Sequence, residues 1–189
     1  LQFCTSLTEF DIRHNCIEIV PYCLQSLKYL VRFPTDGNSV RHPPSEYGDT
    51  LTFDFLRRYW EKIQSCESSG ILTLPSCRLL MFPPEVAESS RLFSVTVHIN
   101  LSHNMLRFLP QSCVSLQKLR YLDVSHNLLT EIHPWISQLL RIEEINYSSN
   151  LLTNMPEELG SSTSMKIVRC RDNRIRLNTA FWIRGMTSL

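Results

Sequence analysis

Four asparagines recur in the C-terminal part of the chain with a constant 23-residue period. Mostly apolar residues hold the same positions around each of them: eight, five and three before the asparagine, and two after it. One such unit has too little apolar surface to form a core alone, so the units are expected to stack into a solenoid. The four asparagines are Asn104, Asn127, Asn150 and Asn173.

Around these asparagines the sequence reads L-x-x-L-x-L-x-x-N-x-L, the pattern of the leucine-rich repeat. We therefore predict an α/β fold, a horseshoe-shaped solenoid with short parallel strands on its inner face. Each asparagine should point inward and bond backbone groups that have left the strand ladder, because buried polar atoms need partners. On the outer arcs, the segments EEL and WISQL predict 3₁₀ or short helical turns.

The pattern also returns near the N-terminus, around Asn15 and Asn38. The interval from Asn38 to Asn104 falls three positions short of three full periods, so a different element lies between them. Apolar residues at helical spacing predict an amphipathic helix from Asp49 or Thr50 to about Gln64, which would cover the open end of the first stack. The segment SCESSG that follows is interpreted as a flexible link.

The second block of repeats begins with an atypical unit. Cys77 takes the asparagine position, and the interval from Cys77 to Asn104 is four positions longer than the period. The extra residues are expected on the outer side. The chain is thus divided into N-terminal repeats over residues 1–48, a capping helix and linker over 49–70, and a second block over 71–189.

Charge and cysteine content indicate which partners and which cellular compartment to expect. The net charge is +1, so no global field favours nucleic acid or an anionic membrane, and no apolar run reaches the about 18 residues of a membrane span. Seven cysteines without a C-x-x-C pair favour free thiols and a reducing, cytoplasmic location. The sequons at Asn100 and Asn146 point weakly the other way, although both lie within predicted strands.

The variable positions of the predicted strands are the candidate contacts for a partner protein. Arginine and tyrosine are frequent anchors of interfaces, so Arg120, Tyr121, Arg169 and Arg171 lead the set. The alternative is that these residues only form a solvated strand face. The predicted concave-face contacts are His98, Asn100, His103, Arg120, Tyr121, Asp123, His126, Glu143, Glu144, Asn146, Lys166, Arg169 and Arg171.

Other kinds of site have weaker support. The basic cluster around Arg169 lies one repeat from Glu143 and Glu144 and has no aromatic residues between its arginines, which disfavours nucleic acid. His103 and His126 hold the same position in adjacent repeats, but a zinc site needs three or four ligands. Catalytic and cofactor motifs are absent, so we expect a protein that is not an enzyme and binds no cofactor.

The chain resembles intracellular leucine-rich repeat proteins of the 23-residue class, which includes the Ras-pathway scaffold SHOC-2. In that class a block can end in G-N-P-[LF]-R followed by a glycine and, eight residues later, Leu-Arg; here Gly37 to Arg41, Gly48 and Leu56-Arg57 hold these positions. The resemblance implies a scaffold that binds proteins and takes part in signalling. Two other classes stay open: a regulatory segment of a larger signalling enzyme, and a structural component of a cytoskeletal or ciliary assembly.

Overall fold

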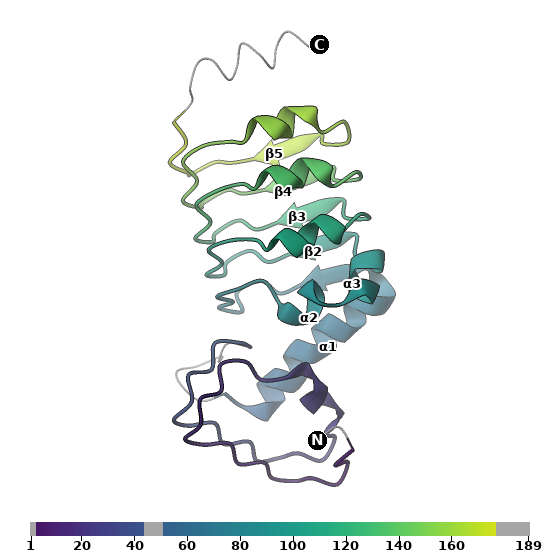
Figure 1. Cartoon of the computed structure of the whole chain (residues 1–189), viewed down its shortest axis with the longest axis vertical. Coiled ribbons are helices and arrows are strands. Elements are labelled where there is room, and N and C mark those ends of the chain that lie inside the picture. The colour runs from purple at the N-terminus through teal and green to yellow at the C-terminus, as the bar shows by residue number, and fades with distance from the viewer. Residues whose placement is uncertain (1–2, 44–50, 177–189) are drawn as a thin grey trace.

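The computed structural model describes residues 3–43 and 51–176. Within them, coils of similar shape stack along one axis, and a single long helix, α1 (Phe53–Ser69), lies between the first two coils and the rest (Figure 1). Pro44, Gly48, Asp49, Thr50, Trp182 and Leu189 lie outside the described residues.

The second block carries one parallel sheet whose strands follow chain order. Corresponding residues of successive coils pair in register, as Leu72 with Ile99 and Ile99 with Leu122. The central residues of the first four strands are buried, whereas the residues that flank them face solvent. This confirms the predicted solenoid of parallel strands. The strands are β1 (Ile71–Thr73), β2 (His98–Asn100), β3 (Tyr121–Asp123), β4 (Glu144–Asn146) and β5 (Ile167–Arg169).

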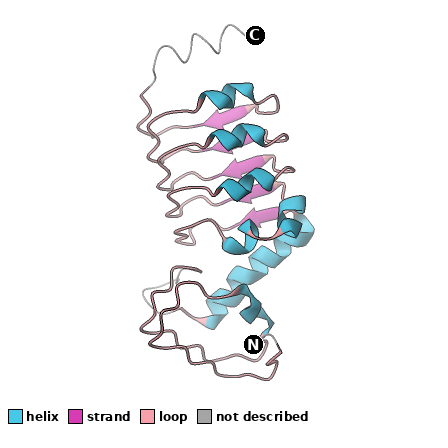
Figure 2. Cartoon of the chain, in the orientation of Figure 1, coloured by secondary structure: helices cyan, strands magenta, loops and turns pink. Residues whose placement is uncertain are grey.

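The outer side of each regular coil carries a single turn of 3₁₀ helix, in a layer that faces the strands (Figure 2). Each turn begins at or just after a proline, whose fixed φ suits the start of a helix and which gives up no needed donor. The EEL and WISQL segments therefore have the predicted structure. The turns are η2 (Gln111–Ser115), η3 (Pro134–Gln138) and η4 (Glu157–Ser161), and η1 (Tyr22–Ser26) is their counterpart in the first block.

The asparagines hold the coils together as predicted. The Asn127 side-chain amide donates to the carbonyl oxygens of Leu101, Val124 and Ser125, and its oxygen accepts from the amide of Leu106. Asn104 and Asn150 make equivalent sets of bonds and are buried. Each asparagine thus joins its own coil to the preceding one.

The helix α1 differs from the prediction at its C-terminal end. It runs through the segment SCESS to Ser69, and Gly70 ends it in a left-handed conformation with φ +70°. The prediction of a flexible link was wrong because tertiary contacts hold this last turn. Cys66 is fully buried within 3.5 Å of the Thr96 hydroxyl, and Glu67 forms an ion pair with Arg91 at 3.3 Å.

Both blocks pack against α1. On one side, Phe53 and Trp60 contact Phe33 and Tyr22 of the first block, with ring centroids 5.7 and 6.1 Å apart. On the other side, α1 lies against β1 and α3 (Ser90–Val95). The buried apolar residues of the two blocks therefore form one continuous core. α2 (Pro84–Ala87) and α3 accommodate the four extra residues on the outer side.

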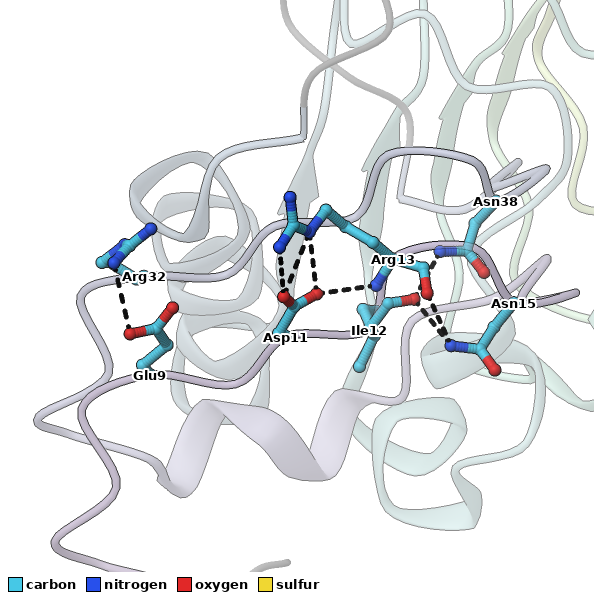
Figure 3. A network of polar contacts seen from close by, with 7 residues as sticks. All are labelled: Glu9, Asp11, Ile12, Arg13, Asn15, Arg32 and Asn38. Atoms are coloured by element: carbon cyan, nitrogen blue, oxygen red, sulfur yellow. Dashed lines mark hydrogen bonds and ion pairs between the residues drawn. The ribbon is translucent and has the colours of Figure 1, made fainter.

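The first block repeats the asparagine arrangement with fewer strand contacts. Its two coils meet at the isolated parallel bridges Glu9–Arg32 and Ile19–His42. The Asn38 amide donates to the carbonyl of Ile12, as its counterparts do in the second block (Figure 3).

Candidate functional site

The solvent-facing side of the β1–β5 sheet, here called the inner face, presents two columns of side chains in register, from the first and the third residue of each strand. The first column runs Ile71, His98, Tyr121, Glu144 and Ile167. Ile71 is 50% and Tyr121 39% exposed, although both are large apolar side chains. His98 lies between them, with its ring centroid 5.7 Å from that of Tyr121. Three adjacent strands thus expose an apolar and aromatic cluster on the inner face, formed by Ile71, His98 and Tyr121.

The second column uses its polar groups within the protein. Asp123 accepts hydrogen bonds from the amide and hydroxyl of Ser125 through one oxygen and from the Asn146 side chain through the other. Asn100 accepts from the amide and hydroxyl of Ser102 in the same way. These side chains therefore stiffen the strand ends and offer few free groups to a partner.

Two glutamates of the inner face form ion pairs with cations of the adjacent coils. Glu143 lies 3.4 Å from Arg120 and 2.8 Å from Lys166. Glu144 forms an ion pair with Arg169. The hydrogen bond from Lys166 lowers the pKa of Glu143, so this carboxyl stays ionised at neutral pH. Glu143 and Glu144 therefore form ion pairs with cations of the adjacent coils.

His103 and His126 form a stacked pair beside the strand ends. Their ring centroids are 4.1 Å apart and their planes differ by 9°. Lone pairs of imidazole nitrogens lie in the ring plane, so two parallel rings cannot both direct one at an ion between them. No group of three or more possible metal ligands is present among the described residues. The pair is a stacking contact with both rings accessible to a partner.

Charged residues of the first block also form ion pairs with one another. Asp11 accepts three hydrogen bonds from the Arg13 guanidinium and one from the Arg13 amide, and Arg32 pairs with Glu9 (Figure 3). The side-chain bonds from Arg13 lower the pKa of Asp11 to about 2.

None of the seven cysteines forms a disulfide bond. Burial raises the pKa of Cys113 to about 12 and also raises the pKa values of Cys66 and Cys170 above the usual thiol value. Because the thiolate is the nucleophile, these three residues are poor candidates for chemistry at neutral pH.

The predicted contacts lie on one surface, but they differ in exposure and in whether they are already paired within the protein. Tyr121 is exposed and lies beside the half-buried His98, whereas Arg120 and Arg169 form ion pairs with glutamates. Arg171 makes no ion pair within the described part of the chain. Ile71 was missed, because with Cys77 in place of asparagine the first strand could be recognised only by its leucines.

Comparison with known proteins agrees with this geometry. The family model "Leucine rich repeat" matches residues 71–129, and no curated protein sequence matches the chain. A leucine-rich repeat protein from Leptospira interrogans is 18% identical with a TM-score of 0.52, over 98% of this chain and 48% of its own. Internalin C2 from Listeria monocytogenes is 16% identical with a TM-score of 0.51, over 94% of this chain and 67% of its own.

A third structure is the ectodomain of the receptor kinase GASSHO1/SCHENGEN3 from Arabidopsis thaliana, in complex with CASPARIAN STRIP INTEGRITY FACTOR 2. It is 21% identical with a TM-score of 0.50, over 97% of this chain and 20% of its own. The chain therefore spans about half or less of two of these three proteins. The chain therefore has the fold of a leucine-rich repeat solenoid. No helix in the described residues is long and apolar enough to cross a membrane.

Proposed function

We propose that this chain is a non-catalytic scaffold that binds a partner protein on its inner, concave face. The observation that carries the proposal is a cluster on three adjacent strands, formed by the exposed Ile71 and Tyr121 and the half-buried His98. Exposed aromatic and apolar side chains held on a rigid sheet lose little entropy on binding, and they supply much of the energy of protein interfaces.

The charged residues have a secondary part in this proposal. A partner that binds Arg169 has to displace Glu144 from it, and a partner that binds Lys166 has to displace Glu143. Such residues set orientation and association rate more than affinity. We therefore expect Tyr121 and His98 to dominate the binding energy.

The test is affinity capture with the full chain, followed by binding measurements with each purified candidate partner. Tyr121→Ala should weaken the partner about tenfold or more, because truncated anchors commonly cost over about 1.4 kcal/mol. The matched control is Tyr29→Ala, which removes a 65% exposed tyrosine of the first block. Equal affinity of wild type and Tyr121→Ala for every captured protein would remove the inner face from consideration.

The closer relationship is a further part of the proposal. The 23-residue period and the motif from Gly37 to Leu56-Arg57 support membership of the SHOC-2-like class, close to leucine-rich repeat-containing protein 40. Seven free cysteines support a cytoplasmic location. Imaging of a fluorescent fusion of the full-length protein tests the location, and a secreted or luminal signal would contradict it.

A further inference from the structure

An open pocket lies at the edge of the inner face, where the outer arcs turn back into β4 and β5. Its volume is about 400 Å³. It is here called the edge pocket, and its polar lining consists of Arg120, Arg141, Glu143, Thr163, Ser164 and Lys166.

The edge pocket carries uncompensated positive charge. The pocket has three cationic side chains and one carboxylate. Arg120 and Lys166 both pair with Glu143, at 3.4 and 2.8 Å. Arg141 is exposed and forms no ion pair with any described residue. Three positive charges against one negative charge leave a net charge of +2 around the pocket.

Hydrogen-bond donors in the same wall are also unused. The hydroxyls of Thr163 and Ser164 have no partner in the described part of the chain. In the preceding coils the amides of Leu119 and Ile142 donate to a carbonyl three residues back, but the equivalent amide of Met165 makes no such bond among the described residues. The pocket therefore combines excess positive charge with unpaired neutral donors.

We propose that the edge pocket binds a phosphoryl group on a serine or threonine side chain of the partner protein. A phosphomonoester carries about −1.5 to −2 charge at neutral pH and three acceptor oxygens, which match the charge and the donors of the pocket. A single carboxylate would leave one positive charge and two donors unused. The proposal rests on the proposed function, because the phosphorylated residue belongs to the protein bound on the inner face.

The surroundings of the pocket favour a peptide over a nucleic acid. No aromatic residue lines the pocket to stack on a base. Leu140, which is 75% exposed, and Met165 line its apolar wall and suit an apolar residue beside the phosphorylated one. Tyr121, directly after Arg120 in the chain, continues the surface onto the inner face.

The test measures anisotropy of fluorescein-labelled peptide pools with the full chain. One pool has a central phosphothreonine with randomised flanks, the second has threonine there, and the third has glutamate. The phosphothreonine pool should bind about tenfold or more tighter than the other two, since charge-assisted hydrogen bonds to a phosphoryl group are stronger than those to a neutral hydroxyl or a single carboxylate. Equal binding of all pools, or tighter binding of a single-stranded oligonucleotide, overturns the proposal.

Three variants are expected to change phosphopeptide affinity in different ways. Arg141→Gln should weaken the phosphothreonine pool about tenfold, because it removes the unpaired cation. Glu143→Gln should strengthen it several-fold, because it removes the repelling carboxylate and frees Arg120 and Lys166. Arg107→Gln, an exposed arginine elsewhere on the block, should leave it unchanged. Equal losses in Arg141→Gln and Arg107→Gln, or weaker binding by Glu143→Gln, contradict a specific pocket.

The same variants separate the two proposals. If Tyr121→Ala loses a captured partner while Arg141→Gln and phosphatase treatment of that partner change nothing, the phosphoryl site is wrong and the scaffold function stands. If the phosphothreonine pool depends on Arg141 while no partner depends on Tyr121, the site stands and the inner-face proposal fails.

Discussion

At the scale of single residues, the asparagine of each coil replaces backbone pairing that the strands are too short to supply. The strands are three residues long, and beyond them the chain turns away, leaving carbonyl and amide groups without ladder partners. One side chain with two donors and one acceptor is the smallest group that serves both kinds. This is why asparagine recurs at this position.

Asn127→Ala should lower the free energy of unfolding by roughly 1–3 kcal/mol, because it leaves buried carbonyls and an amide unpaired. Urea unfolding followed by circular dichroism measures the change. The control is Asn154→Ala, at an exposed position outside the ladder, which should stay within about 0.5 kcal/mol of wild type. Equal losses in the two variants would contradict the structural role of the ladder.

Tyr147 links a single side chain to the pH dependence of stability. Burial raises its pKa well above the usual value near 10. A raised pKa in the folded state means that the stabilisation is fully present below pH 10 and is lost as pH rises above it, because the unfolded chain ionises first.

The unfolding free energy of the wild type should fall between pH 9 and 11, and Tyr147→Phe should reduce this fall. The reduction should reach up to about 1.4 kcal/mol at pH 11, because each pH unit above the unfolded pKa near 10 costs about that much. Burial raises the pKa of Tyr59 as well, so part of the alkaline loss should remain. Urea unfolding at several alkaline pH values gives the slope. A slope identical to that of wild type would show that Tyr147 ionises as readily when folded.

At the scale of elements, α1 takes the place that a regular coil would fill. Thr52 caps its first turn by accepting a hydrogen bond from the Phe55 amide, and Gly70 ends it. Gly70 adopts φ +70°, and a Cβ there would lie 2.8 Å from the carbonyl oxygen of Val95. The carbonyl oxygen of Gly70 accepts hydrogen bonds from the amides of Val97 and His98, so the helix end is joined to the start of β2.

Gly70→Ala should destabilise by at least about 1–2 kcal/mol from the left-handed backbone alone, with the close contact adding to it. Gly160→Ala is the matched control, because a Cβ at Gly160 meets nothing within 4 Å. It should be neutral or stabilising by up to about 1 kcal/mol. Thermal unfolding of both variants distinguishes them, and a Gly70→Ala protein as stable as wild type would contradict the described helix end.

The last turn of α1 shows where local sequence reasoning stopped. Serine and glycine dominate residues 65–70, a composition typical of a link. In the structure, Ser65 and Ser69 donate to carbonyls one turn back, so their hydroxyls do not interrupt the helix. Burial of Cys66 against the second block decides the outcome, and no periodicity within so short a segment could reveal that contact.

At the scale of the whole molecule, a buried hydrogen bond between a histidine and a carboxylate joins the two blocks. His42, at the end of the first block, lies 2.9 Å from Glu85 in α2, and their side chains are 0% and 6% exposed. The Tyr59 hydroxyl of α1 lies 3.3 Å from the same His42 nitrogen. Three elements from different parts of the chain therefore meet at one polar contact inside the shared core.

Glu85→Ala should lower the free energy of unfolding by about 1–3 kcal/mol, because it leaves the buried His42 side chain without its carboxylate partner. Hydrogen exchange should show lost protection in both blocks, including the amides of Phe10 and Ile12 that pair the first two coils. Glu88→Ala, on an exposed neighbour, serves as the control. Loss of protection confined to the second block would mean that the blocks are not one cooperative unit.

Part of the candidate site followed from the sequence alone. Strand pairing in register made it certain that Tyr121 and His98 would be neighbours, since a fixed period places equal positions side by side. The sequence could not reveal that Glu143 is shared between Arg120 and Lys166, because side-chain direction depends on the width of the gap between coils.

The repeating pattern by itself determined the solenoid, its strand register, the inward asparagines and the 3₁₀ turns. These features recur within every period of the repeat, so short-range geometry and apolar spacing specify them. Tertiary structure alone decided where α1 ends, that His42 and Glu85 meet, and which cations of the edge pocket remain uncompensated. Those outcomes depend on contacts between residues tens of positions apart, whose free energy exists only once the coils have stacked.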